Sequence, residues 1–372
     1  MSELRSSLSR VVRGARRMVG HPDIRGWTQY SRLLLMSDAP SWVLAYEMEQ
    51  VGAVANRLGI TTADPKLWPF VKQQSIFYAS HLSLLVGDQW RQPNRLGMAY
   101  MHGKPGTGYE EFDRAFDVLS RHHDRFDRVQ ATHSEMHRVI LQSGIAPEKV
   151  FLIPLGVNPS DFPRVNAETR AAARKRFGIP PHARVVGSFQ KDGVGWGDGL
   201  EAKRVKGPDV LLSVIDQLRA DVPDLFVLLS GPARGHVKAG LQRMGVPFAH
   251  DFIEDPRALA PLYHAIDVYV VSSRQEGGPK AVLEAMSSGV ALVTTRVGQA
   301  MDLVRHGENG WIAEVEDAGA LTAYSREVLI NGAPRAVLDA GRRTAEANTY
   351  EMLLPLWDRF FTGFVERRTA GR

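Results

Sequence analysis

The sequence contains no cysteine in 372 residues, so it can form neither disulfides nor thiolate metal sites, and no cysteine can act as a nucleophile. It has no apolar run near the roughly 20 residues that a membrane-spanning helix needs. Its arginine-rich, broken N-terminus also lacks the pattern of a secretory signal. These absences predict a cytoplasmic protein.

Patterns typical of metal centres are missing too. The sequence has 12 histidines, but the spacing among His81, His122, His123, His133 and His137 is not that of a metal site. No tract is biased enough in composition to predict disorder or a fibrous protein. With 44% hydrophobic and 23% charged residues, the composition is that of a globular protein with a substantial core.

Positive charge is concentrated at the start of the chain. The net charge is +5, and five arginines against Glu3 place +4 of it in residues 1–20, where apolar residues recur at helical spacing. The favoured interpretation is a helix with a solvated basic face. The same pattern fits a helix that lies on an anionic membrane, so peripheral contact with the inner face of the membrane is kept as a second hypothesis. Nucleic acid is not expected as a partner.

The length of the chain fits two domains. Short β-rich apolar runs alternate with longer helical patterns, which is typical of parallel sheets built from βαβ units. We therefore predict an α/β protein in which two Rossmann-like domains, residues 1–160 and 161–345, face each other across a cleft. A proline-rich stretch from Pro154 to Pro181 marks the boundary. Residues 346–372 are expected to form a helix that packs back on the N-terminal domain.

The individual elements follow from the same periodicities. The expected strands are 32–36, 76–86, 96–101, 128–132, 150–154, 184–189, 225–231, 248–253, 268–272 and 291–295. The expected helices are 42–58, 110–122, 134–142, 167–176, 207–220, 256–265, 279–288 and 299–305. Because ligands of such sheets bind beyond the carboxyl ends of the strands, the loops after Phe189, Ser230, Ser272 and Thr295 are the places to seek a site.

The most informative loop is 272–279, between a buried strand and a helix that starts near Pro279. Gly277 and Gly278 lie at the positive end of that helix, where an anionic or hydroxyl-rich ligand can approach the backbone closely. Glu276 precedes the helix and Glu284 lies about two turns inside it, so both can accept hydrogen bonds from one extended ligand. The alternative is that Glu284 pairs with Lys280 at i, i+4 and Glu276 is a solvated acid.

The stretch from Ser273 to Asp317 resembles the donor site of the retaining family 4 glycosyltransferases. The resemblance rests on Glu276 and Glu284 with their Gly-Gly-Pro and Ala-Met-Ser-Ser-Gly context, and on Thr294, Gly298, Gly307, Asn309 and Gly310. The stretches 127–136, 153–162 and 206–212 agree, so the resemblance covers roughly residues 96–347. It implies the GT-B fold and transfer of a hexose from a nucleoside diphosphate sugar, UDP or GDP, to an acceptor hydroxyl with retention of configuration.

The resemblance also implies roles for residues of the loop. Glu276 is similar to the family's acid beside the donor sugar, and Glu284 to the acid that holds the nucleotide ribose. Gly277, Gly278 and Pro279 are expected to cradle the sugar and the diphosphate. Lys280 is counted among the donor-binding residues.

Lys206 resembles the family's lysine that offsets charge on the departing diphosphate. The family usually has a second cation upstream, for which Lys191, Lys203 and Arg204 compete. Lys191, which follows the strand of Ser188 closely, is favoured, and Ser188 is included in the donor site. The chain has no Asp-x-Asp motif, so we expect neither a metal nor another cofactor.

His102 follows the strand 96–101, where many family members carry a histidine that lines the cleft opposite the donor sugar. Thr107 and its glycines are candidates for contact with the acceptor. The family's frequent glycine pair near the first strand is missing from the loop 37–42. The acceptor is therefore expected only as a class, a glycan or a lipid-linked hydroxyl. A nucleotide-sugar epimerase or a phosphorylase of the same fold, and a non-catalytic nucleotide-sugar or membrane-binding protein, remain the alternatives.

Overall fold

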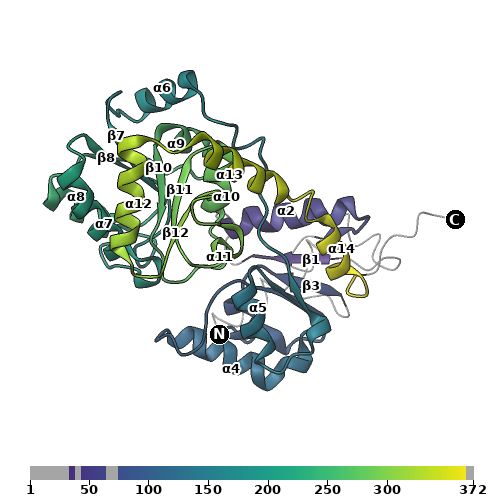
Figure 1. Ribbon diagram of the computed structural model, residues 1–372. Helices are drawn as coiled ribbons and strands as arrows, with labels where there is room; N and C mark the ends of the chain where they lie inside the picture. Colours follow the sequence, from purple (N-terminus) through teal and green to yellow (C-terminus); the bar gives the residue numbers. More distant parts are fainter. Residues whose placement is uncertain (1–32, 38–42, 64–73, 366–372) are drawn as a thin grey trace, which may run out of the picture.

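The computed structural model describes residues 33–37, 43–63 and 74–365. Within these ranges the chain forms two sheets of six parallel strands, each with helices on both faces (Figure 1). The predicted α/β architecture of two Rossmann-like domains is confirmed. The basic segment 1–20 and the loop residues 38–42 lie outside the described residues.

The first sheet forms the N-terminal domain, with strand order β2-β1-β3-β4-β5-β6. Its strands are β1 (Leu33–Met36), β2 (Thr62–Ala63), β3 (Ser75–Tyr78), β4 (Arg95–Tyr100), β5 (Arg128–Ala131) and β6 (Val150–Leu152). Its helices are α2 (Val43–Arg57), α3 (His81–Leu85), α4 (Glu110–His122) and α5 (Ser134–Leu141). Successive residues of β3 point to opposite faces. Ile76 and Tyr78 pack with α4 and α5, and Phe77 packs with α2.

The second sheet forms the C-terminal domain, with strand order β12-β11-β10-β7-β8-β9. Its strands are β7 (Arg184–Ser188), β8 (Leu225–Leu229), β9 (Phe248–His250), β10 (Val268–Val271), β11 (Ala291–Thr295) and β12 (Trp311–Ala313). Its helices are α6 (Ala167–Arg176), α7 (Pro208–Asp221), α8 (Gly235–Met244), α9 (Ala260–Ala265), α10 (Lys280–Ser288), α11 (Ala300–Leu303), α12 (Ala318–Asn331) and α13 (Arg335–Ala347).

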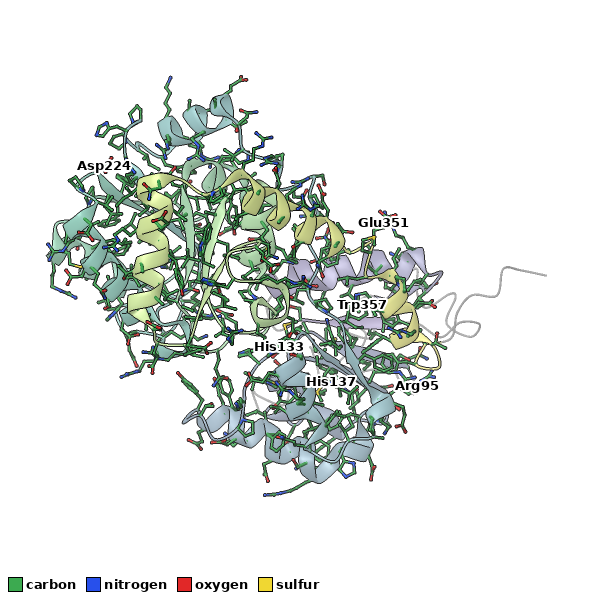
Figure 2. The ribbon with its side chains drawn as sticks, viewed as in Figure 1. Arg95, His133, His137, Asp224, Glu351 and Trp357 are labelled. Atoms are coloured by element: carbon green, nitrogen blue, oxygen red, sulfur yellow. The ribbon has the colours of Figure 1, made fainter. Side chains whose placement is uncertain are left out.

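The chain passes between the domains twice, once after β6 and once after α13. The two crossovers lie side by side, because the Val157 amide donates to the Asn348 carbonyl at 3.1 Å and Val157 forms a parallel bridge with Thr349. After the second crossover, α14 (Leu354–Phe361) lies on the first sheet (Figure 1). There Trp357, labelled in Figure 2, lies against the N-terminal domain. Its ring meets that of Phe77 edge-on, with 5.8 Å between ring centroids.

The order of the second sheet places a natural crevice next to β7. From β7 the chain adds β8 and β9 on one side, and from β10 it adds β11 and β12 on the other side. The carboxyl ends of the neighbouring strands β7 and β10 therefore form a topological switch point. The loop after Ser188 and the loop 272–279 leave the sheet at this point. The fold thus brings together two of the four loops that the sequence indicated.

One predicted strand is wrong over much of its length. The strand expected over 76–86 ends at Tyr78, and α3 occupies His81–Leu85. The reason is local: the Ser80 side chain accepts a hydrogen bond from the Ser83 amide at 3.4 Å, which caps the helix and turns the chain out of the sheet. The strands β2 and β12 and the helices α8, α12 and α13 were not predicted.

No helix in the described part of the chain has the length and apolar character needed to cross a membrane.

Candidate functional site

Glu276 and Lys206 meet at the switch point. The Lys206 ammonium lies 2.6 Å from Glu276 Oε2, and the hydroxyl of Ser273 donates to Glu276 Oε1 at 2.8 Å. The Glu276 side chain is only 11% exposed, so both of its oxygens are held in place by these two neighbours. A carboxylate and a cation at this distance form a strong charge-assisted contact.

Gly207 explains how Lys206 reaches this position. Its backbone has φ +60, which favours glycine, and an added Cβ would lie 2.9 Å from the Ser272 carbonyl carbon. The Ser272 hydroxyl donates to the Gly207 carbonyl at 2.9 Å. This close approach of the two loops fixes the start of α7 against the loop of Glu276.

His102 faces the same pair from the N-terminal domain, directly after β4. It is half-buried, with its ring edge-on to the rings of His81 (5.7 Å between centroids) and Phe112 (5.4 Å). Burial, and after it the positive charge of Lys206, lower the pKa of His102 to about 4. His102 is therefore neutral at physiological pH. The structure thus brings together all three residues that were predicted to be catalytic.

A cavity of about 330 Å³ lies between the domains at this point. The N-terminal domain contributes His102, Lys104, Thr107 and His133, and the C-terminal domain contributes Glu276 with its neighbours in the loop. Figure 2 shows His133 at the level where the two domains face each other. Thr107, the candidate for acceptor contact, accepts a hydrogen bond from Gln275 at 2.7 Å. The loop 102–108 is thereby tied to the loop of Glu276.

Glu284 lines a second, smaller cavity of about 120 Å³, together with Phe189 and Phe252 of the same domain. The N-terminal domain contributes Val43 to this cavity. The Tyr263 hydroxyl donates to Glu284 Oε2 at 2.6 Å. Burial raises the pKa of Glu284, while the charge of Lys280 and the bond from Tyr263 oppose that rise. Glu284 is thus a buried carboxyl group held in one orientation beside an aromatic-lined space.

Gly277 and Gly278 lie at close contacts between the two domains. A Cβ on Gly277 would lie 2.7 Å from the carbonyl oxygen of Met101 in the other domain, and one on Gly278 would lie 2.8 Å from Leu155 Cδ1. Thr132 donates to the Gly277 carbonyl at 2.8 Å. Pro279 precedes the first residue of α10 and acts as its N-cap rather than as its first helical residue.

Lys280 does not form an ion pair with Glu284, the local alternative that the sequence left open. Its ammonium instead lies 3.0 Å from Glu47 Oε2 on α2 and donates to the Tyr350 hydroxyl at 2.6 Å. Lys280 therefore connects α10 with the N-terminal domain.

The three candidates for the second cation occupy different surroundings. The Lys191 ammonium lies 3.9 Å from the centroid of the Trp196 ring, and burial lowers its pKa. Burial also lowers the pKa of Lys203, which feels the charges of Lys206 and Glu276. Arg204 is exposed. Lys203 is thus the candidate with electrostatic coupling to both members of the central pair.

Ser188 is buried beneath an arginine that the sequence did not single out. Arg234 donates to the Ser188 carbonyl at 2.6 Å and to its hydroxyl at 3.2 Å, and its Nε lies 3.0 Å from Asp192 Oδ1. The side chains of Arg234 and Asp192 are both 0% exposed. The only signal in the sequence was the position of Arg234 in the loop after β8, one of the four indicated loops.

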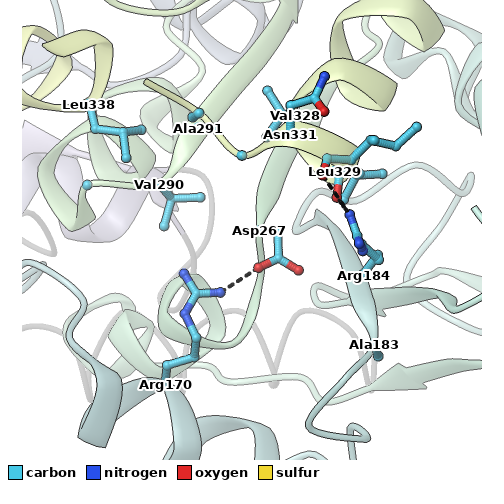
Figure 3. Close-up of a pocket in the computed structure, with 14 residues that line it drawn as sticks. Arg170, Ala183, Arg184, Asp267, Val290, Ala291, Val328, Leu329, Asn331 and Leu338 are labelled. Carbon is cyan, nitrogen blue, oxygen red and sulfur yellow. Dashed lines mark hydrogen bonds and ion pairs between the residues drawn. The ribbon is translucent and has the colours of Figure 1, made fainter. Parts of the chain in front are cut away.

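Another cavity, of about 420 Å³, lies at the opposite edge of the second sheet, where β7, β10 and β11 begin (Figure 3). The charged groups in it already have partners: Arg170 lies 2.6 Å from Asp267 Oδ1, and Arg184 donates to the Leu329 carbonyl. Within the described residues, no group of three potential metal-ligating side chains gathers in one place. The cleft at Glu276 and Glu284 is therefore the candidate site.

Comparison with known proteins points to the same region. Residues 201–344 match the family model described as glycosyl transferases group 1. The chain is 29% identical over 262 residues to a D-inositol 3-phosphate glycosyltransferase of Geodermatophilus obscurus, an alignment that covers 66% of this chain and 54% of that protein. This chain thus spans about half the length of that relative.

Solved structures share the fold. The crystal structure of Anabaena Alr3699/HepE in complex with UDP and glucose matches with a TM-score of 0.71 and 14% identity, over 90% of this chain and 100% of that one. Sucrose-phosphate synthase from Thermosynechococcus elongatus matches with a TM-score of 0.62 and 22% identity, over 77% and 73% of the two chains. The chain has the GT-B fold, and the part that holds Lys206, Glu276 and Glu284 is similar to glycosyl transferases group 1.

Proposed function

We propose that this protein is a glycosyltransferase that moves a hexose from a nucleoside diphosphate sugar to an acceptor hydroxyl with retention of configuration. The observation that carries the proposal is the Lys206–Glu276 pair at the switch point, with Glu284 at the neighbouring pocket on α10, the helix that follows the loop of Glu276. The similarity of residues 201–344 to glycosyl transferases group 1 supports it.

The nucleoside of the donor occupies the pocket of Glu284 in this proposal. Tyr263 holds one carboxylate oxygen, Oε2, and the other accepts hydrogen bonds from the ribose hydroxyls. Phe189 and Phe252 supply the apolar walls for the base. UDP is the first nucleotide to test, because Alr3699/HepE was crystallised with UDP and with UDP-glucose. GDP is the second.

In the reaction, the bond between the anomeric carbon and the diphosphate oxygen breaks, and its electron pair leaves with the diphosphate. Lys206 lies where this charge develops and stabilises it, as a fixed cation in a partly buried site does. Lys203 and the amide groups at the start of α10 add to this effect. Glu276 holds the sugar hydroxyls in place beside the reacting carbon.

The acceptor hydroxyl must lose its proton as its oxygen bonds to the anomeric carbon. With a pKa of about 4, His102 is a weak base. The departing diphosphate is the better proton acceptor, since phosphate groups have a second pKa near 6. We therefore assign His102 the role of a neutral hydrogen-bonding group that orients the sugar, not that of a general base.

Three further points belong to the proposal. Turnover requires no metal, because cations of the protein carry the leaving-group charge. The acceptor is a hydroxyl of a glycan or of a lipid-linked sugar. D-inositol 3-phosphate is also an acceptor to test, because the relative from Geodermatophilus obscurus is named a D-inositol 3-phosphate glycosyltransferase. Contact of residues 1–20 with an anionic membrane remains the second hypothesis for that segment, beside a solvated basic helix. Flotation with anionic liposomes, with and without these residues, tests the last point.

The test is release of nucleotide from UDP- and GDP-sugars in the presence of an acceptor panel and excess EDTA. Glu276→Ala and Lys206→Ala should each lower turnover by about 100-fold or more. Glu168→Ala and Lys175→Ala on the exposed face of α6 are matched controls and should keep full activity. The anomeric coupling constant of the product, measured by NMR, reports retention or inversion.

Other outcomes separate the alternatives. Formation of an isomeric nucleotide sugar without acceptor would identify an epimerase, and phosphate-dependent release of a sugar phosphate a phosphorylase. Binding of a nucleotide sugar without turnover would identify a non-catalytic binder. Near-native turnover in both Glu276→Ala and Lys206→Ala would show that the reaction occurs elsewhere.

A further inference from the structure

Four separate parts of the chain meet at the ammonium of Lys280. It lies 3.0 Å from Glu47 Oε2 on α2, and it donates to the Tyr350 hydroxyl at 2.6 Å and to the Gly156 carbonyl at 3.2 Å. Tyr350 in turn donates to Glu47 Oε2 at 2.7 Å. The side chains of Lys280 and Glu47 are only 8% and 4% exposed. We call Lys280, Glu47 and Tyr350 the interdomain clasp.

The clasp lies where the chain crosses between the two domains. Gly156 belongs to the first crossover and Tyr350 to the second, and the two crossovers are bonded to each other through Val157 and Asn348. They also pack tightly, because a Cβ on Gly156 would lie 2.9 Å from Cδ1 of the Tyr350 ring. One cation on α10 thus binds both connections between the domains and a helix of the N-terminal domain. Figure 1 shows α2 beside α10 and α13 at the junction of the two domains.

The same helix α2 forms part of the pocket of Glu284. Val43, at the start of α2, lines that pocket together with Lys280 and Glu284 of α10. Glu47 lies one turn after Val43, and Glu284 lies one turn after Lys280. The bond between Glu47 and Lys280 therefore joins the two helices that both contribute residues to the pocket.

A buried ion pair of this kind depends on the hydrogen bonds around it. Both charges lose water when the domains dock, and their attraction offsets that loss only if the geometry is held by further hydrogen bonds. Tyr350 and Gly156 supply those bonds here. Loss of any one of these partners therefore leaves a buried charge or polar group uncompensated while the domains stay docked.

We propose that Lys280 is a positioning residue of the pocket of Glu284 and that it acts through the interdomain clasp, which holds α2 and Val43 over the pocket. The nucleotide-binding part of this proposal rests on the proposed function, whereas the control of domain arrangement does not. The sequence predicted that Lys280 binds the donor itself. In the structure its ammonium contacts Glu47 and Tyr350 instead.

The domain arrangement can be measured in the ligand-free protein. Because the chain has no cysteine, Glu148→Cys and Ala220→Cys on exposed positions of the two domains provide the only labelling sites. Electron–electron distance measurements between spin labels then give the distribution of domain separations. Lys280→Met, Glu47→Gln and Tyr350→Phe should each broaden it or shift it to longer distances. Tyr350→Phe removes only a hydroxyl, so it keeps the test available if a charge variant does not fold.

The matched control is the neighbouring ion pair between Arg257 and Glu49. It also joins α2 to the C-terminal domain, but its side chains are 44% and 59% exposed. Exposed pairs of this kind contribute little. The double variant Arg257→Gln with Glu49→Gln should therefore leave the distance distribution unchanged.

Measurements of UDP binding distinguish a Lys280 that acts through the clasp from a Lys280 that contacts the nucleotide itself. Glu47→Gln, Tyr350→Phe and Lys280→Met should all weaken UDP binding in calorimetry by about tenfold, a typical coupling between sites. If only Lys280→Met weakens it, or if no variant changes the distance distribution, the clasp is refuted. If the unsubstituted protein binds neither UDP nor GDP, the proposed function fails in its present form, and the distance distributions still decide whether the clasp controls the domains.

Discussion

His102 provides the most direct quantitative test of the site, because its protonation state reports how the cleft is built. Burial and the nearby charge of Lys206 lower its pKa from 6.5 to about 4. In the unfolded chain, His102 takes up a proton as the pH falls through about 6.5, while in the folded protein it stays neutral until about 4. Protonation therefore stabilises the unfolded state first. The free energy of unfolding falls as the pH drops from about 6.5 towards about 4.

The size of the loss follows from proton linkage. Between about pH 7.5 and pH 5, His102 should cost the folded protein about 2 kcal/mol. For a domain of this size, that corresponds to a fall in melting temperature of roughly 4–8 °C. His102→Gln is neutral at every pH and should lack this part of the acid-induced fall.

The assay compares melting temperatures across this pH range for the unsubstituted protein and for His102→Gln. His182→Gln, at an exposed position, is the matched control and should behave like the unsubstituted protein. Other buried histidines are present in all three proteins, so the difference isolates His102. An equal fall in all three, or an imidazole that titrates near 6.5 by NMR, would refute the account of the cleft.

Three other substitutions have defined outcomes. Arg234→Met should lower the free energy of unfolding in urea by about 3–5 kcal/mol, because it leaves Asp192 buried and uncompensated, and adding Asp192→Leu should restore most of it. Gly277→Ala should weaken nucleotide binding and lower the melting temperature, because its Cβ collides with Met101 of the other domain. Glu284→Gln should raise the melting temperature at neutral pH, because burial raises the pKa of Glu284 and an ionised carboxylate there opposes folding. The same substitution should abolish detectable UDP binding in calorimetry. A loss of both UDP binding and melting temperature would contradict this assignment.

The elements around the site could be predicted from sequence where local rules dominate. The helix α4 has the predicted bounds Glu110–His122, and β10 ends one residue before the predicted end. The expected strand over 76–86 was wrong because its apolar residues fit both a buried strand and a short helix, and the Ser80 cap decides for the helix. The rule that ligands bind beyond the carboxyl ends of parallel strands pointed to the loops after β7 and β10, which the fold places together.

The partners of charged residues could not be predicted in the same way. A lysine four residues before a glutamate favours a local pair, yet Lys280 bonds to Glu47, 233 residues away. Arg234 and Asp192 are equally ordinary in sequence. Which acid a lysine or arginine meets depends on how the two domains dock, and no local periodicity records that arrangement.

These long-range contacts link the loop of Glu276 to the N-terminal domain on both sides of its glycines. Before them, Gln275 donates to Thr107 at 2.7 Å and accepts from the Lys104 amide at 3.3 Å. After them, Lys280 at the start of α10 donates to Glu47 at 3.0 Å. A movement that separates the two domains at this segment must therefore break the bonds at Gln275 and at Lys280 together.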